Sequence, residues 1–149
     1  ILDVNTGELQ YSNAGHNPPL IFPPGRSPEW LPLPSGLVLG VAEEASYEAR
    51  RTQLRPGAML LLYTDGVTEA MDKDHRLYGE NRLMQIAADA AGDRPEPLIE
   101  RIVNDVHRHV GAAAQSDDIT LLSIRYKGAS PSNRPSDKKP DKEPNKEKQ

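Results

Sequence analysis

The chain has 149 residues, a formal net charge of −4 and no cysteine, with 27% charged and 36% hydrophobic residues. This length allows about one domain, and without cysteine neither disulfides nor thiolate chemistry is available. No apolar run approaches the ~18 residues that a membrane-spanning helix needs, so no such segment is expected in this sequence.

The C-terminal segment, residues 129–149, contains no Val, Ile, Leu, Met or aromatic residue, and it carries six basic and four acidic side chains. Such a segment buries too little apolar surface to offset the entropy of ordering, so we predict a disordered, charged tail. The body, residues 1–128, therefore carries a net charge of −6. An acidic body argues against nucleic acid as the main partner, because phosphate binding needs clustered Lys and Arg, and it suits a protein that gathers divalent cations.

The first half of the chain reads as a series of short strands. It begins with Ile1 in the middle of a strand pattern, so we expect part of a longer protein whose N-terminal portion is missing. Residues 1–4 and 8–12 flank Asn5-Thr6-Gly7, with Gly where a positive φ is favoured, which predicts a β-hairpin. Residues 18–22 and 30–33 read as strands on either side of a loop rich in Pro and Gly, and Pro places such strands at sheet edges.

Two further strands are predicted in the middle of the chain, after a glycine-bracketed apolar loop at 35–40. Residues 47–54 alternate between polar and apolar side chains, and residues 58–64 form a continuous apolar run. The sequence Arg55-Pro56-Gly57 between them is typical of a turn. We therefore predict that these two strands pair as a hairpin.

The second half changes to a helical period. Residues 79–91 place apolar side chains at i, i+3, i+4 and i+7, and residues 95–110 repeat this pattern between Pro95 and Gly111. Residues 119–126 read as a closing strand. The order of several strands, two helices and one strand predicts a mixed α+β sandwich with helices packed on sheet.

Four acidic side chains stand beside small residues at strand ends or turns: Asp65, Glu69 and the pair Asp117-Asp118. Mg²⁺ and Mn²⁺ prefer oxygen ligands, and a carboxylate at the end of a buried strand supplies one in a fixed place. Gly66 would let a metal or substrate approach the backbone closely. The alternatives are a plain turn for Asp65-Gly66 and a loop or amide cap for Asp117-Asp118, of which at most one should face a given metal.

A second polar cluster lies in Asn13-Ala14-Gly15-His16-Asn17-Pro18-Pro19. Because Pro cannot continue a central strand, the chain must turn here and expose His16 or Asn17 at a sheet end. His16 is then a candidate to contact a phosphate or a metal-bound water. Equally, His and Asn in this segment can bond the local backbone to fix the turn. The other histidines, His75, His107 and His109, are expected to have structural roles.

Five blocks taken together resemble one family: "NAGHNPPLI", "LVLG", "LRPGAMLLLYTDGVTEA", "YGENRL" and "QSDDITLLSIRY", in this order. They resemble the bacterial SpoIIE-type, RsbU-like branch of the PPM (protein phosphatase type 2C-like) serine/threonine phosphatases, across nearly all of residues 1–126. The resemblance implies a four-layer α-β-β-α sandwich that holds two Mn²⁺ or Mg²⁺ ions. It implies Asp65 and Asp117 as metal ligands, Gly66 beside the site, and His16 with Asn17 near the metal centre as catalytic candidates.

The resemblance also implies a substrate and a setting. Substrates in this branch are phosphoserine or phosphothreonine on anti-sigma-factor antagonists, which are small STAS-like proteins. We expect a cytoplasmic protein without nucleic-acid or membrane contacts from this segment, and a homodimer through the phosphatase domain is a further expectation.

One departure from the family pattern is clear: nothing in the chain matches the N-terminal "GD-x-x-D"-like block that supplies further metal ligands. The alternative to an enzyme is therefore an inactive fragment or pseudo-phosphatase that acts as a protein-binding regulatory module. Keeping both Asp65 and Asp117 favours the enzyme, and the missing block favours the module. A metal-dependent nuclease is disfavoured because the body is acidic and no basic groove is expected.

Overall fold

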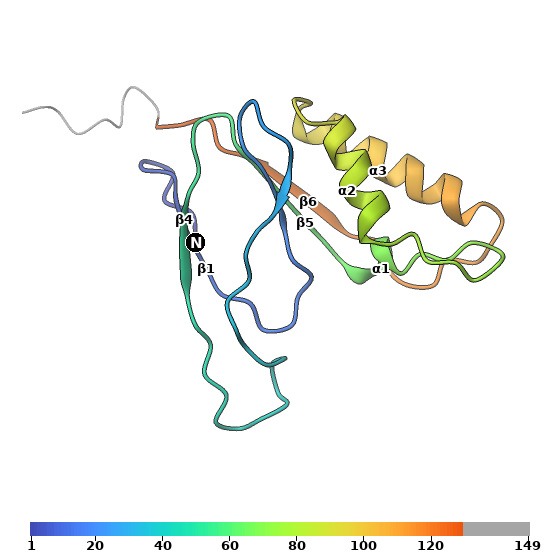
Figure 1. Cartoon of the computed structure of the whole chain (residues 1–149), viewed down its shortest axis with the longest axis horizontal. Helices are drawn as coiled ribbons and strands as arrows, with labels where there is room; N and C mark the ends of the chain where they lie inside the picture. Colours follow the sequence, from blue (N-terminus) through green and yellow to red (C-terminus); the bar gives the residue numbers. More distant parts are fainter. Residues whose placement is uncertain (130–149) are drawn as a thin grey trace, which may run out of the picture.

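The computed structural model describes residues 1–129, and the predicted tail lies outside them except for Ala129 (Figure 1). The elements in chain order are β1 (Glu8–Tyr11), β2 (Leu20–Phe22), β3 (Glu29–Trp30), β4 (Arg50–Gln53), β5 (Met59–Tyr63), α1 (Asp65–Thr68), α2 (Glu80–Asp89), α3 (Pro95–Val110) and β6 (Leu121–Arg125). The fold is therefore mixed α+β, as predicted. No helix within residues 1–129 is long and apolar enough to cross a membrane.

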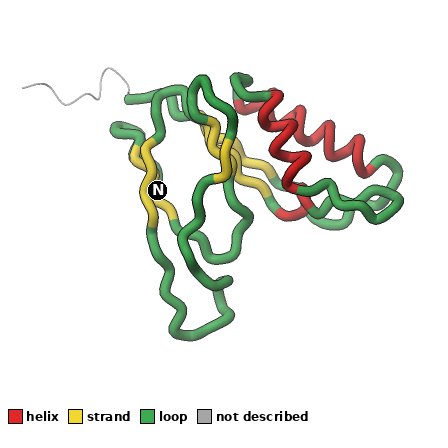
Figure 2. The backbone as a smooth tube through the Cα atoms, in the orientation of Figure 1, coloured by secondary structure: helices red, strands yellow, loops and turns green. Residues whose placement is uncertain are grey.

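The strands form two sheets, one of four strands in the order β3-β2-β5-β6 and one made of β1 and β4. All pairs are antiparallel, and β5 lies in the middle of the larger sheet between β2 and β6. Helices α2 and α3 cover one face of the larger sheet, and the β1-β4 sheet lies on its other side (Figure 2). The described residues thus form three layers, helix, sheet and sheet, and a second helix layer has no counterpart among them.

The continuous apolar run of β5 is explained by burial on both faces of its sheet. Met59, Leu61 and Tyr63 belong to the core beneath α2 and α3. Leu60 belongs to the second core, between the two sheets, and Leu62 packs against it. A strand with water on one face would alternate apolar and polar residues, and β5 does not because both faces are covered.

Both helix predictions are confirmed. Helix α2 occupies residues within the predicted segment 79–91, and α3 coincides with residues 95–110. Their buried apolar side chains are at the predicted helical spacing: Leu83 and Ala87 on α2, and Leu98, Ile102 and Val106 on α3. Helix α3 has Pro95 in its first turn, where a missing N–H costs no hydrogen bond, and it ends at Gly111, whose φ of 58° is left-handed.

The predicted hairpin between residues 47–54 and 58–64 is wrong. Strand β4 pairs with β1, whereas β5 pairs with β2 and β6, so the two segments belong to different sheets. The turn at Arg55-Pro56-Gly57 carries the chain from one sheet to the other, and Leu54 and Ala58 on either side of it are buried between the sheets. The local turn signal was correct, but tertiary packing decided which strands pair.

The N-terminal hairpin is present in a shorter form than predicted. Its turn is closed by Gly7, with a φ of 80°, and residues 1–4 contribute a single bridge between Leu2 and Leu9. Ile1 is 91% exposed and Val4 is 62% exposed. These side chains gain little from extending the ladder, which explains why the first predicted strand is reduced to one pair.

A buried ion pair joins α2 to α3. Asp105 on α3 is only 4% exposed. It accepts hydrogen bonds from Arg82 Nε at 2.7 Å, from Arg82 Nη2 at 3.1 Å and from the Tyr78 hydroxyl at 3.0 Å. The bidentate Arg82 guanidinium lowers the pKa of the Asp105 carboxyl, and the Tyr78 hydrogen bond adds to this effect.

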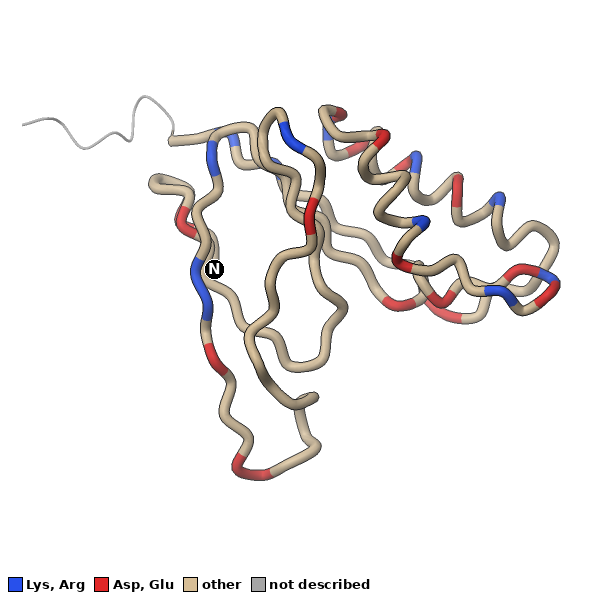
Figure 3. Tube along the Cα trace, in the orientation of Figure 1, with Lys and Arg blue, Asp and Glu red and all other residues tan. Residues whose placement is uncertain are grey.

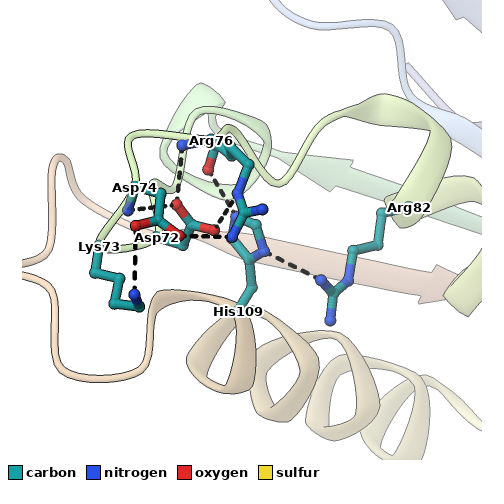
Figure 4. Close-up of polar contacts among 6 residues, drawn as sticks. All are labelled: Asp72, Lys73, Asp74, Arg76, Arg82 and His109. Carbon is teal, nitrogen blue, oxygen red and sulfur yellow. Dashed lines mark hydrogen bonds and ion pairs between the residues drawn. The ribbon is translucent and has the colours of Figure 1, made fainter.

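The same network extends to the loop before α2 (Figure 4). Arg82 Nη1 donates to His109 Nδ1 at 3.1 Å, and His109 Nε2 donates to the Arg76 carbonyl oxygen at 2.9 Å. Arg76 in turn binds Asp72 and Asp74 through its guanidinium. Since a carbonyl only accepts, His109 carries its proton on Nε2, and it serves the structural role that the sequence predicted.

We predict that Asp105→Asn lowers the free energy of unfolding at pH 7 by about 2–4 kcal/mol, because Arg82 loses its buried partner while keeping some contact with solvent. The pKa of Asp105 is lowered on folding, so its contribution is present above the unfolded value of about 3.9 and is lost as the pH falls through the folded value. Urea unfolding of both proteins from pH 7 to pH 2.5 measures this. A stability difference that stays constant over this range would contradict the assignment.

Candidate metal centre

Thr64 fastens the end of β5 to the segment that leads into β6. Its hydroxyl donates to the Asp118 carbonyl oxygen at 2.8 Å and accepts from the Thr120 amide at 3.0 Å. The Thr64 amide donates to the Thr120 carbonyl oxygen at 3.1 Å. These bonds bring the Asp117-Asp118 pair, which lies some fifty residues later in the sequence, beside Asp65.

Gly66 is what allows this close approach. It belongs to α1, the single helical turn that follows β5 in place of the plain turn considered from the sequence. A Cβ at Gly66 would overlap the Asp118 carbonyl oxygen, and it would lie 2.9 Å from the Asp118 carbonyl carbon and 3.3 Å from that of Asp117. Its φ is not left-handed, so the need for glycine here is steric rather than conformational.

The two predicted carboxylates face solvent at this edge. Asp65 Oδ1 accepts from the Gly66 amide at 3.0 Å, and Asp117 Oδ1 accepts from the Asp118 amide at 2.7 Å. Within residues 1–129 neither Oδ2 oxygen has a hydrogen-bond or ion-pair partner. Each carboxylate thus keeps one oxygen for a ligand, and oxygen is the ligand atom that Mg²⁺ and Mn²⁺ prefer.

The His16 loop is fixed by the side chain of Asn13. Asn13 Oδ1 accepts from the amides of Gly15 at 2.8 Å and His16 at 2.9 Å, and Asn13 Nδ2 donates to the His16 carbonyl at 2.8 Å. His16 Nδ1 donates to the Asn17 carbonyl oxygen at 2.9 Å. In the neutral ring this leaves Nε2 as a free acceptor. The local bonds weighed from the sequence are therefore present, and they leave one imidazole nitrogen unused.

A cavity of about 140 Å³ joins the two predicted clusters. It is lined by Gly15, His16, Asn17, Tyr63, Thr64 and Asp65. The structure thus brings His16 and Asn17 to the same cavity as Asp65, although these residues lie far apart in the sequence. Asp117 does not line this cavity, and it adjoins the site through its backbone contact with Gly66. Glu69 contributes its carbonyl oxygen, which accepts from Ser116 Oγ at 3.4 Å.

Sequence reasoning missed three residues of this region: Thr64, Asn13 and Tyr63. The segment Asn13-Ala14-Gly15 carries a signal that could have been used, since Asn side chains commonly bond the backbone amide two residues on. Tyr63 gives no such signal. Its hydroxyl is buried without a hydrogen-bond partner in the described part of the chain, and burial together with the nearby Glu80 raises its pKa to about 12.

The carboxylates do not make a complete metal site by themselves. Among residues 1–129, no three His, Asp or Glu side chains stand close enough together to hold an ion. Asp65 and Asp117 fit a hard cation in their chemistry and would supply two ligand groups. Further ligands would have to be water molecules, backbone oxygens or groups outside the described residues.

Comparison with known proteins decides the family. The family model described as "Stage II sporulation protein E (SpoIIE)" matches residues 1–127. The chain belongs to the SpoIIE family. It is a SpoIIE-family, PP2C-like phosphatase domain sequence, which confirms the resemblance noted from the five sequence blocks.

Two relatives show the range of this similarity. Protein IcfG of Synechocystis is 29% identical over 124 residues, which cover 83% of this chain and 19% of IcfG. Phosphoserine phosphatase RsbU of Bacillus subtilis is 24% identical over 120 residues, covering 80% of this chain and 35% of RsbU. The SpoIIE-family chain thus spans about a fifth to a third of the length of these relatives.

Solved structures match the fold over most of the chain. The RsbU and RsbW domains of Rv1364c from Mycobacterium tuberculosis match with a TM-score of 0.66 and 29% identity, over 87% of this chain and 35% of that one. The phosphatase domain of SpoIIE from Bacillus subtilis, presoaked with Mn, matches with a TM-score of 0.63 and 19% identity, over 88% of this chain and 56% of that one. The mixed α+β fold is therefore that of PPM phosphatase domains.

We predict that Gly66→Ala lowers the free energy of unfolding by about 1–3 kcal/mol, because the new methyl group pushes the Asp117-Asp118 backbone away. Urea unfolding monitored by circular dichroism measures this. Gly36→Ala is the matched control, since its Cβ would lie 3.3 Å from the Asn13 carbonyl oxygen and 3.8 Å from the Tyr47 ring, without the overlap found at Gly66. Equal losses of stability in the two variants would contradict the claim that close packing against the Asp118 backbone requires glycine at position 66.

Proposed function

We propose that this SpoIIE-family chain is part of a metal-dependent phosphatase that hydrolyses phosphoserine or phosphothreonine in a protein substrate. Family membership and the relation to phosphoserine phosphatase RsbU support the reaction class. The observation that supports the proposal is the tie from Thr64 to Asp118, which holds the Asp117-Asp118 backbone against Gly66, next to Asp65 and the cavity lined by His16 and Asn17.

In this proposal Asp65 and Asp117 hold Mn²⁺ or Mg²⁺ through their free Oδ2 oxygens, and Gly66 keeps the backbone clear of the ion. A bound ion lowers the pKa of a coordinated water and stabilises charge on phosphoryl oxygens. His16 Nε2, the unused acceptor, would accept a hydrogen bond from a water molecule in the cavity. Asn17 offers amide N–H groups to the phosphoryl oxygens.

Several finer points belong to the same proposal. We infer that the full domain is a four-layer α-β-β-α sandwich with two ions, to which residues 1–128 contribute the C-terminal part and 129–149 a tail. The proposed substrate is a phosphorylated, STAS-like anti-sigma-factor antagonist, and the phosphatase domain is proposed to form homodimers. Support for these points comes from family membership alone.

A second candidate is a non-catalytic module that binds a phosphorylated partner. One observation favours it for this chain taken alone: the described residues contain no group of three metal-ligating side chains. The first candidate requires that the missing ligands come from elsewhere in a longer protein.

A chimera tests the proposal. The chain replaces the matching region of Bacillus subtilis RsbU, and hydrolysis of p-nitrophenyl phosphate and of a phosphoserine protein is measured in Mn²⁺. Because metal ligation contributes several kcal/mol to the reaction, Asp65→Asn and Asp117→Asn are each expected to lower kcat/KM by about a hundredfold or more.

Asp118→Asn is the control, since its backbone rather than its carboxylate holds the loop together, and it is expected to keep most of the activity. Undiminished activity of the Asp65→Asn and Asp117→Asn chimeras would remove both residues from the proposed metal site. A folded chimera without activity in Mn²⁺ would favour the non-catalytic module.

A further inference from the structure

A groove lies at the end of the larger sheet opposite to Asp65. It consists of two adjoining cavities of about 530 and 540 Å³, which share Gly57 and Arg125 as lining residues. We call it the distal groove. Strand β5 links the two ends, since it begins with Met59 at the distal groove and ends with Tyr63 at the candidate metal centre.

The distal groove carries unpaired positive charge. Arg94, Arg125 and Lys127 line it, and none of them has an ion-pair or side-chain hydrogen-bond partner within residues 1–129. Two of the nearby acidic groups are already paired, Asp93 with Arg101 at 2.8 Å and Glu29 with Arg26 at 3.9 Å. Figure 3 shows Lys and Arg segments at this end of the sheet, with Asp and Glu segments beside them where α2 ends and α3 begins.

One wall of the groove is apolar. Pro23 and Pro24 form it, and Pro24 is exposed. Phe22 and Met59 close the groove beneath, but they are only 4% and 3% exposed and belong to the core, so they offer little surface to a ligand. A ligand that fits must therefore bring an apolar group to the proline wall and negative charge to the rim.

Three occupants match this combination poorly. Nucleic acid offers a dense row of phosphates, which the acidic body repels and which three cations near Glu96 neutralise only in part. Residues 130–149 begin three positions after Lys127, but they have no Val, Ile, Leu, Met or aromatic residue and more basic than acidic side chains. A free phosphate would leave the apolar wall of Pro23 and Pro24 unused.

We infer that the distal groove is a docking site for an acidic segment of a partner protein, in which one or two large apolar side chains stand between Asp and Glu residues. The apolar side chains pack on Pro23 and Pro24, and the carboxylates pair with Arg94, Arg125 and Lys127. Arg125 is expected to contribute most to binding because it lines both cavities. The inference does not depend on phosphatase activity, since the groove shares no lining residue with the candidate metal centre.

Fluorescence anisotropy of the full chain tests the inference. The probe is a short fluorescein-labelled peptide with Leu-Phe between two Asp-Glu pairs. We expect saturable binding that weakens as salt rises, because exposed ion pairs are screened. Arg125→Glu is expected to weaken binding by about fivefold to tenfold, whereas Arg125→Lys should change it by less than about threefold.

Controls separate charge at this groove from charge elsewhere. Arg51→Glu alters an exposed cation on β4 that lines neither cavity of the groove, and it is expected to leave peptide binding unchanged. Circular dichroism confirms that each variant is folded. A peptide with Lys in place of the acids, and one with Ala in place of Leu-Phe, are both expected to bind at least about fivefold more weakly.

Four results would overturn the inference: no binding at millimolar peptide, equal binding by Arg125→Glu, equal binding of the Ala peptide, or tighter binding of a single-stranded RNA oligomer. Light scattering tests the remaining possibility, that a second copy of the chain occupies the groove. A dimer that Arg125→Glu dissociates would assign the groove to a second copy of the chain.

Discussion

The hydroxyl of Thr64 donates to the Asp118 carbonyl and accepts from the Thr120 amide, and with these two bonds it ties the end of β5 to the start of β6. The proposed metal centre depends on this contact, because it places Asp117 beside Asp65. Gly66 makes the contact sterically possible. The two cores on either face of β5 then hold that strand in place, so the position of Asp65 is set by the packing of the whole larger sheet.

Where the sequence was informative, the reason is local. The helical period at 79–91 and 95–110 predicted α2 and α3 because the spacing of apolar residues within an amphipathic helix indicates its buried face. The apolar run of β5 likewise indicated that both faces of this strand are buried. Carboxylates beside small residues at strand ends suggested Asp65, Glu69 and the pair Asp117-Asp118, with a plain turn, a loop or an amide cap as alternatives. The resemblance to a phosphatase family then selected Asp65 and Asp117 among them.

Where the sequence failed, the cause is long-range. No pattern within residues 47–64 could reveal that β4 and β5 join different sheets, because the pairing partners β1, β2 and β6 lie elsewhere in the chain. The cavity shared by His16 and Asp65 is likewise a product of tertiary packing. The distal groove could not be predicted from the net charge. The chain is acidic as a whole, but folding brings three unpaired cations together at one end of the sheet. The role of Thr64 could not be predicted because its hydrogen bond to Asp118 exists only in the folded chain.

The most direct measurement of the central claim, that Asp65 and Asp117 form one cation-binding edge, is paramagnetic broadening by Mn²⁺ in amide NMR spectra of the chain, with Mg²⁺ as the diamagnetic reference. Broadening is expected first at the amides of Asp65, Gly66 and Asp118, next at His16, and not at Arg125. Asp117→Asn should remove the effect at Gly66 as well as at its own site. Broadening centred on the Asp72–Asp74 turn, or an effect at Gly66 that survives Asp117→Asn, would contradict the account.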